Sequence, residues 1–447
     1  MKRIFYLFAI LLFLVACADD DTFSTSNGLR LTFSKDTLSL DTLFSKTPSS
    51  TYSFWVYNRN DDGLRLKNVQ LKRRNQTGFR VNVDGTYLDN ALGSLVNNLE
   101  LRSKDSLLVF VELTSSETLH SEPTLLEDDL VFTLESGIEQ KVNLRAWSWD
   151  AQKCYDLKVT KDTLIESSIP LVIYGGITVA EGACLTVRNT TLYFHDGKGI
   201  DVYGRLVTDS VTLRGDRLDR MFVYLPYDRV SGQWGTDGGI IFHQSSTENI
   251  LRKTEIRNAG QYGVLCDSAA YDSEVLRLDM QQCVIHNCKG TGLASYHANI
   301  RVCDCQFSNT LGDCVAVFGG NATIQRCTMA KFYPFAAPRG AALSFGNPTP
   351  LYGLTCDSSI VTGYDEDVVM GLVSDTANVF EYRFMNTLLR TPKVLTADSV
   401  RFTNIIWETP KDSIQGKQHF KIIDEDNLYY DFHLDSLSTA WGLGCYR

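Results

Sequence analysis

Apolar and polar residues alternate along the chain from residue 29 to about residue 149. A period of two is typical of β-strands that bury one face, whereas a helix would show a period near 3.6. Turn residues such as Asp84-Gly85 separate the runs. Short strands at this spacing predict an antiparallel β-sandwich over residues 29–149. The clearest apolar sets are Leu29/Leu31/Phe33, Tyr52/Phe54/Val56, Phe79/Val81/Val83, Leu107/Val109/Val111 and Leu130/Phe132/Leu134.

After Asp150 the pattern changes to short apolar groups separated by glycines, and a repeat becomes visible. Cys283, Cys305 and Cys327 each open a short apolar segment, and successive copies lie 22 residues apart. An earlier copy at Thr254 lies 29 residues before Cys283, and we expect the excess in a loop near Tyr271. Each copy leads to a glycine and a small apolar strand. Weaker copies follow at Ser358–Ile360, Asn386–Leu388 and Thr403–Ile405.

A repeat of about 22 residues with three short strands is the length of one coil of a right-handed parallel β-helix, which we expect over residues 150–432. One coil cannot bury its inner face alone, so the coils must stack about 4.8 Å apart. The leucine-asparagine consensus of leucine-rich repeats is absent, and a propeller would need blades of about 40 residues. Asn258, Asn287 and Asn309 fall at one coil position, which predicts a ladder of side-chain amide hydrogen bonds.

The N-terminus has the features of an export signal. Met1-Lys2-Arg3 precedes an apolar run over residues 4–16, which is typical of a signal peptide and short for a transmembrane helix. The run ends Leu14-Val15-Ala16-Cys17, which resembles the bacterial lipobox. The resemblance implies a signal peptide over residues 1–16, lipid on Cys17, a tether over residues 17–28 and the membrane as a partner.

Three further resemblances concern location and architecture. Ala18-Asp19-Asp20-Asp21 is similar to the acidic export signal of Bacteroidetes surface lipoproteins, which implies the outer membrane facing the cell exterior; a solvated tether on the periplasmic side is the alternative. The predicted sandwich resembles immunoglobulin-like domains that precede repeat domains in bacterial surface proteins, although it lacks the paired cysteines of antibody domains. Four segments resemble bacterial lipoproteins known only as right-handed β-helix proteins, with residues 433–447 as a tail or cap: Ile177–Leu185, Gly215–Leu218, Gly232–Gly235 and Asp431–Leu434.

Net charge and cysteine content bear on the partners and the metal sites that can be expected. The net charge of −10 argues against nucleic acid as a partner. Of the 12 cysteines, lipidation would use Cys17. Cys283 and the nearby His286 suggest zinc, but alternation along a strand would point their side chains to opposite faces. We therefore expect no metal or cofactor, and we expect Cys283, Cys305 and Cys327 to be free thiols stacked in the interior.

The segment from Gly215 to Gly239 is too long for a coil turn, and loops of this length are often functional. Its aromatic side chains could stack on sugar rings or anchor a protein, or could cover the helix as a structural flap. Both interpretations stay open at this point. The candidate ligand-binding residues are Arg217, Asp219, Tyr224, Tyr227 and Trp234.

The fold is also used by polysaccharide lyases and hydrolases, which need paired carboxylates or a base beside carboxylates. Groupings of suitable residue types occur, but none forms a signature, and we assign no catalytic residue. They are Asp216/Arg217/Asp219/Arg220, Asp304/Asp313 and Asp365-Glu366-Asp367. The sequence therefore predicts an all-β surface lipoprotein whose β-helix serves adhesion or binds a glycan or protein. A lyase-like enzyme and a structural envelope protein are the alternatives.

Overall fold

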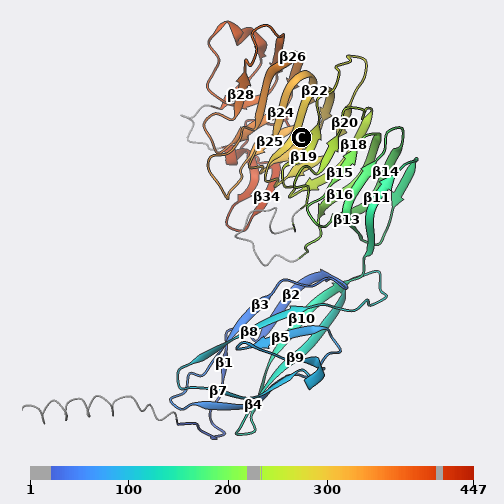
Figure 1. Ribbon diagram of the computed structural model, residues 1–447. Coiled ribbons are helices and arrows are strands. Elements are labelled where there is room, and N and C mark those ends of the chain that lie inside the picture. Colours follow the sequence, from blue (N-terminus) through green and yellow to red (C-terminus); the bar gives the residue numbers. More distant parts are fainter. Residues whose placement is uncertain (1–21, 219–231, 233, 409–415, 447) are drawn as a thin grey trace, which may run out of the picture. The chain divides into compact units, whose positions relative to one another are not determined.

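The computed structural model describes residues 22–218, 232, 234–408 and 416–446 of the chain. The chain divides into two compact units between Asp150 and Ala151, and both are built from β-strands (Figure 1). In the described part of the chain, no helix has the length and apolar content that a membrane span requires. The predicted all-β architecture, an immunoglobulin-like sandwich followed by a right-handed parallel β-helix, is confirmed.

The first unit is a sandwich of two five-stranded sheets. Alternation decides which side chains fill its core: in β3, Phe54 and Val56 are buried while Trp55 between them is exposed. The pairing is antiparallel as predicted, except that β2 runs parallel to β10. One sheet contains β1 (Thr32–Phe33), β3 (Tyr52–Tyr57), β8 (Ser106–Leu113), β5 (Phe79–Val83) and β6 (Thr86–Tyr87). The other contains β2 (Thr37–Phe44), β10 (Glu139–Trp149), β9 (Thr124–Leu134), β4 (Leu64–Leu71) and β7 (Leu95–Leu101), and the short 3₁₀ helix η1 (Asn90–Leu92) precedes β7.

Part of the expected tether is bound to this sandwich. Ser24 N–H donates to the Gly63 carbonyl at 2.9 Å, and Gly63 N–H donates to the Thr22 carbonyl at 2.8 Å. The guanidinium of Arg65 lies 4.4 Å from the centre of the Phe23 ring. The chain is therefore already held against the sandwich at Thr22.

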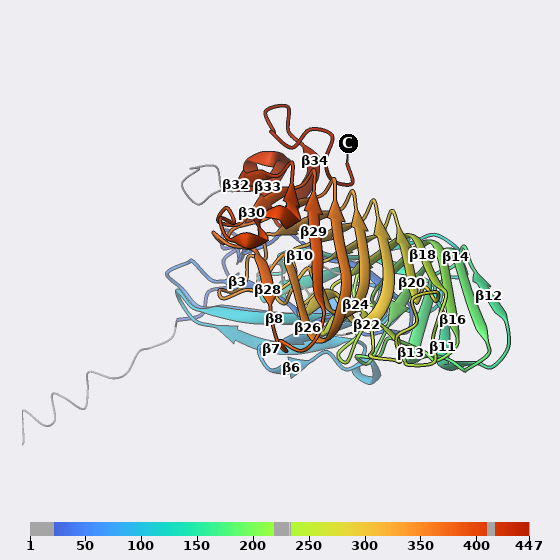
Figure 2. The ribbon, with the colours of Figure 1, turned by 90° about the horizontal axis from the view of Figure 1, so that it is seen from above.

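The second unit is a parallel β-helix whose coils follow each other in sequence order (Figure 2). Each coil contributes to three parallel sheets, which we number first, second and third. The strands that lie within a single sheet are given first. The first sheet contains β15 (Ile200–Val202), β17 (Ile240–Phe242), β19 (Tyr262–Cys266) and β28 (Val369–Leu372). The second contains β12 (Thr163–Glu166), β20 (Leu278–Gln281), β29 (Phe380–Met385) and β31 (Phe402–Thr403), with η2 (Ala397–Arg401) before β31. The third contains β21 (Val284–His286), β23 (Gln306–Ser308), β25 (Thr328–Lys331), β27 (Ile360–Gly363), β30 (Leu388–Arg390) and β32 (Ile406–Glu408).

Longer strands bend from one sheet into the next. These are β11 (Gln152–Val159), β13 (Leu171–Val179), β14 (Cys184–Phe194), β16 (Arg205–Gly215), β18 (Asn249–Arg257), β22 (Thr291–Cys303), β24 (Val315–Gln325) and β26 (Leu343–Asp357). Stacked apolar columns fill the interior. In the third sheet Ile256, Ile285, Phe307 and Met329 are in register, and all four are fully buried.

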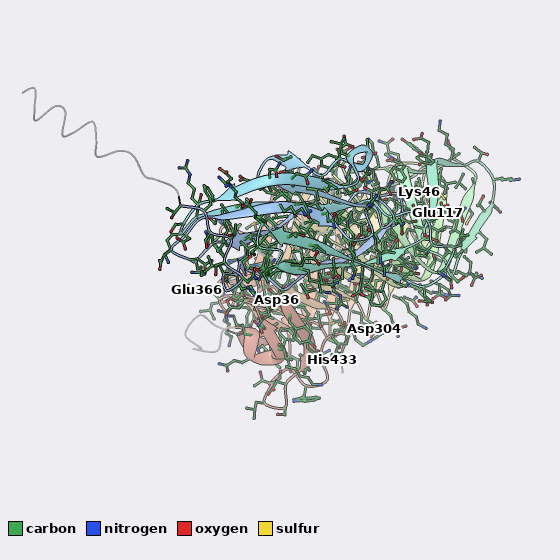
Figure 3. The ribbon with its side chains drawn as sticks, turned by 90° about the horizontal axis from the view of Figure 1, so that it is seen from below. Asp36, Lys46, Glu117, Asp304, Glu366 and His433 are labelled. Atoms are coloured by element: carbon green, nitrogen blue, oxygen red, sulfur yellow. The ribbon has the colours of Figure 1, made fainter. Side chains whose placement is uncertain are left out.

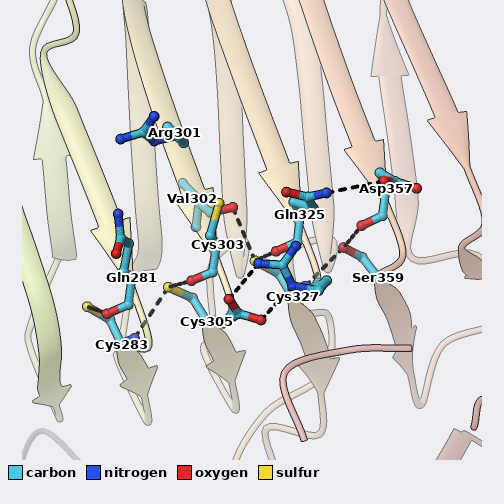
Figure 4. A network of polar contacts seen from close by, with 12 residues as sticks. Gln281, Cys283, Arg301, Val302, Cys303, Cys305, Gln325, Cys327, Asp357 and Ser359 are labelled. Atoms are coloured by element: carbon cyan, nitrogen blue, oxygen red, sulfur yellow. Dashed lines mark hydrogen bonds and ion pairs between the residues drawn. The ribbon is translucent and has the colours of Figure 1, made fainter. Parts of the chain in front are cut away.

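The cysteine repeat marks one of these interior columns. Cys283, Cys305, Cys327 and Ser359 lie on successive coils (Figure 4), and Cys283 N–H donates to Cys305 Sγ at 3.3 Å. Cys283, Cys305 and Cys327 are free thiols, as predicted, and the other described cysteines are free as well. Burial, together with the neighbouring Cys283 and Cys327, raises the pKa of Cys305, so this thiol is neutral and unreactive.

The three predicted asparagines do share one coil position, but their role differs from the prediction. Asn258, Asn287 and Asn309 have φ of 64°, 59° and 51°, the left-handed region in which asparagine is favoured over bulkier residues. Their Oδ1 atoms have no hydrogen-bond partner among the described residues, so the predicted chain of amide hydrogen bonds through these oxygens is not formed. An inter-coil amide contact occurs elsewhere, where Asn404 Nδ2 donates to Asn386 Oδ1 at 2.8 Å.

A C-terminal segment, residues 416–446, covers the outer face of the third sheet and includes residues before the expected tail at 433–447. It contains η3 (Gly416–His419), β33 (Phe420–Asp424) and β34 (Tyr429–Leu434). Its apolar residues pack on outward-facing residues of β25, β27 and β30, which explains why the outer face is apolar there. This cluster contains Ala330, Phe332, Ile360, Leu388, Phe420, Phe432, Leu434 and Ala440.

Candidate functional site

The long loop after Gly215 returns to the β-helix at a buried tryptophan. Trp234 is fully buried, its ring stacks on Phe194 with centroids 5.0 Å apart, and its Nε1–H donates to the Arg257 carbonyl at 2.9 Å. Of the two interpretations left open for this loop, the burial of Trp234 supports a structural role for this residue, and its candidate role in ligand binding is not supported. Arg217 is half-buried, and its carbonyl accepts a hydrogen bond from the Arg214 guanidinium. Asp219, Tyr224 and Tyr227 lie outside the described residues, as does Cys17.

Replacing Trp234 by alanine should destabilise the β-helix by about 3 kcal/mol, because it leaves a cavity and removes the partner of a buried carbonyl. Trp234→Phe, which keeps the stacked ring, should cost about 1 kcal/mol. Urea unfolding of both variants measures the difference. Equal free energies of unfolding for wild type and Trp234→Ala would show that the Trp234 side chain does not stabilise the β-helix.

A column of aromatic and acidic side chains runs along the outer edge of the first sheet. In every coil its residue directly follows the inward-facing residue at the end of the strand. We call this set the aromatic column. Its members, on five successive coils, are Tyr203, His243, Asp267, Tyr296 and Phe318.

The aromatic column consists of two stacked pairs with a carboxylate between them. The rings of Tyr203 and His243 are 4.1 Å apart and 5° from parallel, and those of Tyr296 and Phe318 are 5.7 Å apart and 20° from parallel. His243 and Tyr296 are two coils apart, about 10 Å at the coil spacing. The coil between them carries the Asp267 carboxylate at this position in place of a ring.

Polar groups surround the aromatic column. His243 Nε2 lies 2.9 Å from Asp201 Oδ1. Burial, a hydrogen bond with Tyr262 and the charges of Asp313 and Asp267 raise the pKa of Tyr296 to about 12. The Tyr296 phenol therefore stays protonated at neutral pH. The site offers a hydroxyl donor and carboxylate acceptors beside ring faces.

A loop over residues 267–277 forms one wall next to the column. It accounts for the 29-residue step of the repeat, as predicted from the excess near Tyr271. Between this loop and the neighbouring coils lies a cavity of about 120 Å³, which we call the side pocket. Its lining contains Gln244, Thr247, Ala269, Ala270, Tyr271, Asp272, Val275, Arg277, His297, Ala298 and Asn299.

A second groove, of about 460 Å³, lies on the third sheet beside the C-terminal segment. Asp304 and Tyr446 line this groove. The His433 ring packs against the Tyr446 ring, with ring centroids 4.3 Å apart. Figure 3 labels Asp304 and His433. The polar groups of this groove are paired: Asp304 accepts two hydrogen bonds from Arg326 at 2.8 and 2.7 Å, and Tyr446 donates to Gln306 at 2.7 Å. This pairing makes the groove a junction that holds the C-terminal segment.

Among the described members of the charged groupings noted in the sequence, the carboxylates of Asp216 and Asp313 are held by structural hydrogen bonds. Asp216 accepts a hydrogen bond from His195, and Asp313 accepts one from the Ala341 N–H. Lys331, below the turn that carries Asp313, is fully buried and donates to the carbonyls of Thr310, Leu311 and Gly312. In the part of the chain that is described, no group of three His, Cys, Asp or Glu side chains could hold a metal. His286 points outward, to Glu255 at 3.0 Å, as alternation predicted.

Sequence reasoning missed the aromatic column because its members share no residue type. A positional signal was present: in the copies at Gly199, Gly239, Gly263 and Gly292, the column residue is the fourth after the glycine. An alignment of the repeat copies on these glycines places Tyr203, His243, Asp267 and Tyr296 at one position.

The comparisons with known proteins concern fold only. No curated protein matches the sequence. Among solved structures, the YadV chaperone is 8% identical (26% of this chain and 50% of that one covered, TM-score 0.18). A Porphyromonas gingivalis W83 protein of unknown function is 15% identical (30% and 58%, 0.20). The GH87 α-1,3-glucanase catalytic unit of Streptomyces thermodiastaticus strain HF3-3 is 10% identical (80% and 88%, 0.27).

The chain thus spans about half of the chaperone's length, and at these TM-scores none of the three informs function. One family model matches, with the description "Right handed beta helix region", over residues 157–330. This range lies within the second unit, and the chain contains a right-handed parallel β-helix domain.

Proposed function

We propose that this protein is an exported lipoprotein, anchored to the outer membrane through Cys17 and facing the cell exterior, whose β-helix binds a glycan without turning it over. The aromatic column is the observation that carries the binding proposal. Sugar rings present apolar faces and hydroxyl edges, so they fit a site of ring faces, carboxylate acceptors and a phenol donor. The column spans four coil steps, about 19 Å, which suits an oligosaccharide lying along the helix axis.

The charges favour a glycan without acidic groups. Asp201, Asp267 and Asp313 lie on or beside the face that carries the column, and like charges would repel a uronic acid polymer. A lyase would also need an exposed base beside its carboxylates. A cation close to Asp313 is Lys331, but burial lowers its pKa and its ammonium is held by turn carbonyls. Non-catalytic binding therefore explains this site better than the lyase alternative does.

Binding of neutral and acidic oligosaccharides to the detergent-solubilised full-length protein tests the proposal. We expect binding of neutral chains, and we expect Tyr203→Ala and Tyr296→Ala each to weaken it about tenfold, equivalent to ~1.4 kcal/mol. Tyr155→Ala is the matched control, because Tyr155 is 66% exposed and lies outside the column. Absence of binding, equal affinities for all variants, or release of products would each overturn the proposal.

The anchor is tested separately by metabolic labelling with an alkyne fatty acid. Wild-type protein should carry the label and sediment with outer membranes, and Cys17→Ala should do neither, because lipidated cysteine supplies the membrane affinity. Surface display should make the protein accessible to protease added to intact cells. Label retained in Cys17→Ala would refute the anchor.

A further inference from the structure

The side pocket lies directly beside the centre of the aromatic column. Ala269 and Ala270 follow Asp267 by two and three residues, and His297 follows Tyr296. A sugar bound at the aromatic column near Asp267 would therefore lie close to this cavity. Its volume of about 120 Å³ is that of roughly four water molecules, so it suits a small substituent and not another ring.

The wall of the side pocket is held in place before any ligand arrives. Arg277 is 4% exposed, and its guanidinium donates to the carbonyls of His243 at 2.7 Å, Ser246 at 3.2 Å and Asp267. Asn299 Nδ2 donates to the Ser273 carbonyl at 2.9 Å. The Tyr271 ring stacks on Tyr352 at 4.6 Å. A preformed wall loses little conformational entropy on binding, which favours a specificity pocket.

The lining of the pocket contains both apolar residues and hydrogen-bonding residues. Ala269, Ala270, Val275 and Ala298 contribute methyl groups. The Thr247 hydroxyl and the Gln244 amide can donate hydrogen bonds. A substituent with a methyl group at one end and a carbonyl beside it would match both the apolar lining residues and the hydrogen-bond donors.

His297 supplies an acceptor. Its Nδ1 lies 3.1 Å from the Ala269 carbonyl, and a carbonyl can only accept, so Nδ1 carries the proton. In the neutral imidazole the other nitrogen, Nε2, is then an acceptor. Nε2 is buried and has no hydrogen-bond partner among the described residues. A buried acceptor without a donor is unfavourable, and an N–H group that reaches it would relieve that cost.

We propose that the side pocket takes the acetamido group of an N-acetylhexosamine, so that the bound glycan contains N-acetylated amino sugars. The acetyl methyl packs against the alanine and valine methyls, the amide N–H donates to His297 Nε2, and the carbonyl accepts from Thr247 or Gln244. An O-acetyl ester has no N–H, and a hydroxymethyl group has no methyl for the apolar lining residues. This inference rests on the proposed glycan binding at the aromatic column.

The test compares matched oligosaccharides on the full-length protein in detergent by isothermal titration calorimetry. β-1,4-linked N-acetylglucosamine oligomers should bind at least tenfold more tightly than glucose oligomers of the same length and linkage. Saturation-transfer NMR should show the strongest saturation on the acetyl methyl protons. Ala270→Leu, at an exposed position that lines the pocket, should remove the preference by filling the cavity while glucose oligomers still bind.

Ser268→Leu is the matched control, because Ser268 is exposed in the same loop and does not line the pocket. It should keep the tenfold preference. His297→Phe, which keeps a ring but loses the acceptor, should reduce the preference in part. Equal affinities of the two series for wild type would overturn the acetamido inference and leave glycan binding standing. Failure of both series to bind would overturn the proposed function together with this inference.

Discussion

Replacing Ile285 by aspartate should unfold the β-helix, with a loss of at least about 4 kcal/mol in the free energy of unfolding. Ile285 is fully buried in β21, in register with Ile256 on the preceding coil and Phe307 on the next. A carboxylate there would be enclosed between apolar side chains without a partner. Circular dichroism melting and urea unfolding measure the loss.

Val284→Asp is the matched control for this substitution. Val284 is the neighbouring residue on the same strand, half-buried and lining the groove on the outer face. Its carboxylate would be solvated, so the cost should be small. Unchanged melting of Ile285→Asp, or equal loss in both variants, would contradict the observed coil register.

Replacing Glu408 by alanine should release the C-terminal segment from the third sheet. Glu408 is buried with Arg390 at 2.9 Å, and it also accepts from Thr362 Oγ1 at 2.7 Å. Its Oε2 lies 3.7 Å from Nε2 of His419 in the C-terminal segment, and His419 contacts Ser438 at 3.0 Å. Removing the carboxylate takes away the anion that faces the buried Arg390 guanidinium, and breaking a buried ion pair in this way typically costs about 3–5 kcal/mol.

The expected result is local. Hydrogen exchange in β33 and β34 should accelerate, and protease should cut within residues 416–446, while the coils before Cys327 keep their protection. Glu381→Ala is the control, because Glu381 pairs with Arg401 at 2.7 Å on the surface, where such pairs contribute at most about 1 kcal/mol. Equal protection in Glu408→Ala and wild type would show that apolar packing alone holds the segment.

The coil register could be predicted because its interior positions repeat both in residue type and in spacing. The weak copies at Ser358–Ile360 and Asn386–Leu388 also proved to be in register. The sequence left the role of Trp234 open, since a tryptophan in a long loop has no sequence feature that distinguishes a core anchor from a surface contact. Only the fold shows that its ring reaches Phe194 from the preceding coil.

The candidate site was harder to predict than the fold for a physical reason. Interior columns are constrained by packing, so they keep apolar residues of similar size. The aromatic column faces outward, where each coil is free to carry a different residue, and its members became neighbours only through the stacking of coils. The side pocket depends on a loop, and its shape follows from contacts such as Tyr271 with Tyr352, 81 positions apart in the chain.

The contacts of Thr22 and Phe23 with Gly63 set the length of free chain between Cys17 and the sandwich. With lipid on Cys17, five residue steps separate the anchor from Thr22, and a fully extended chain covers about 18 Å over that distance. A tether free up to residue 28 would reach about twice as far. If Cys17 carries lipid as proposed, this short free chain would confine the sandwich to the layer next to the lipid headgroups, and its surface loops at that end would meet whatever coats the membrane.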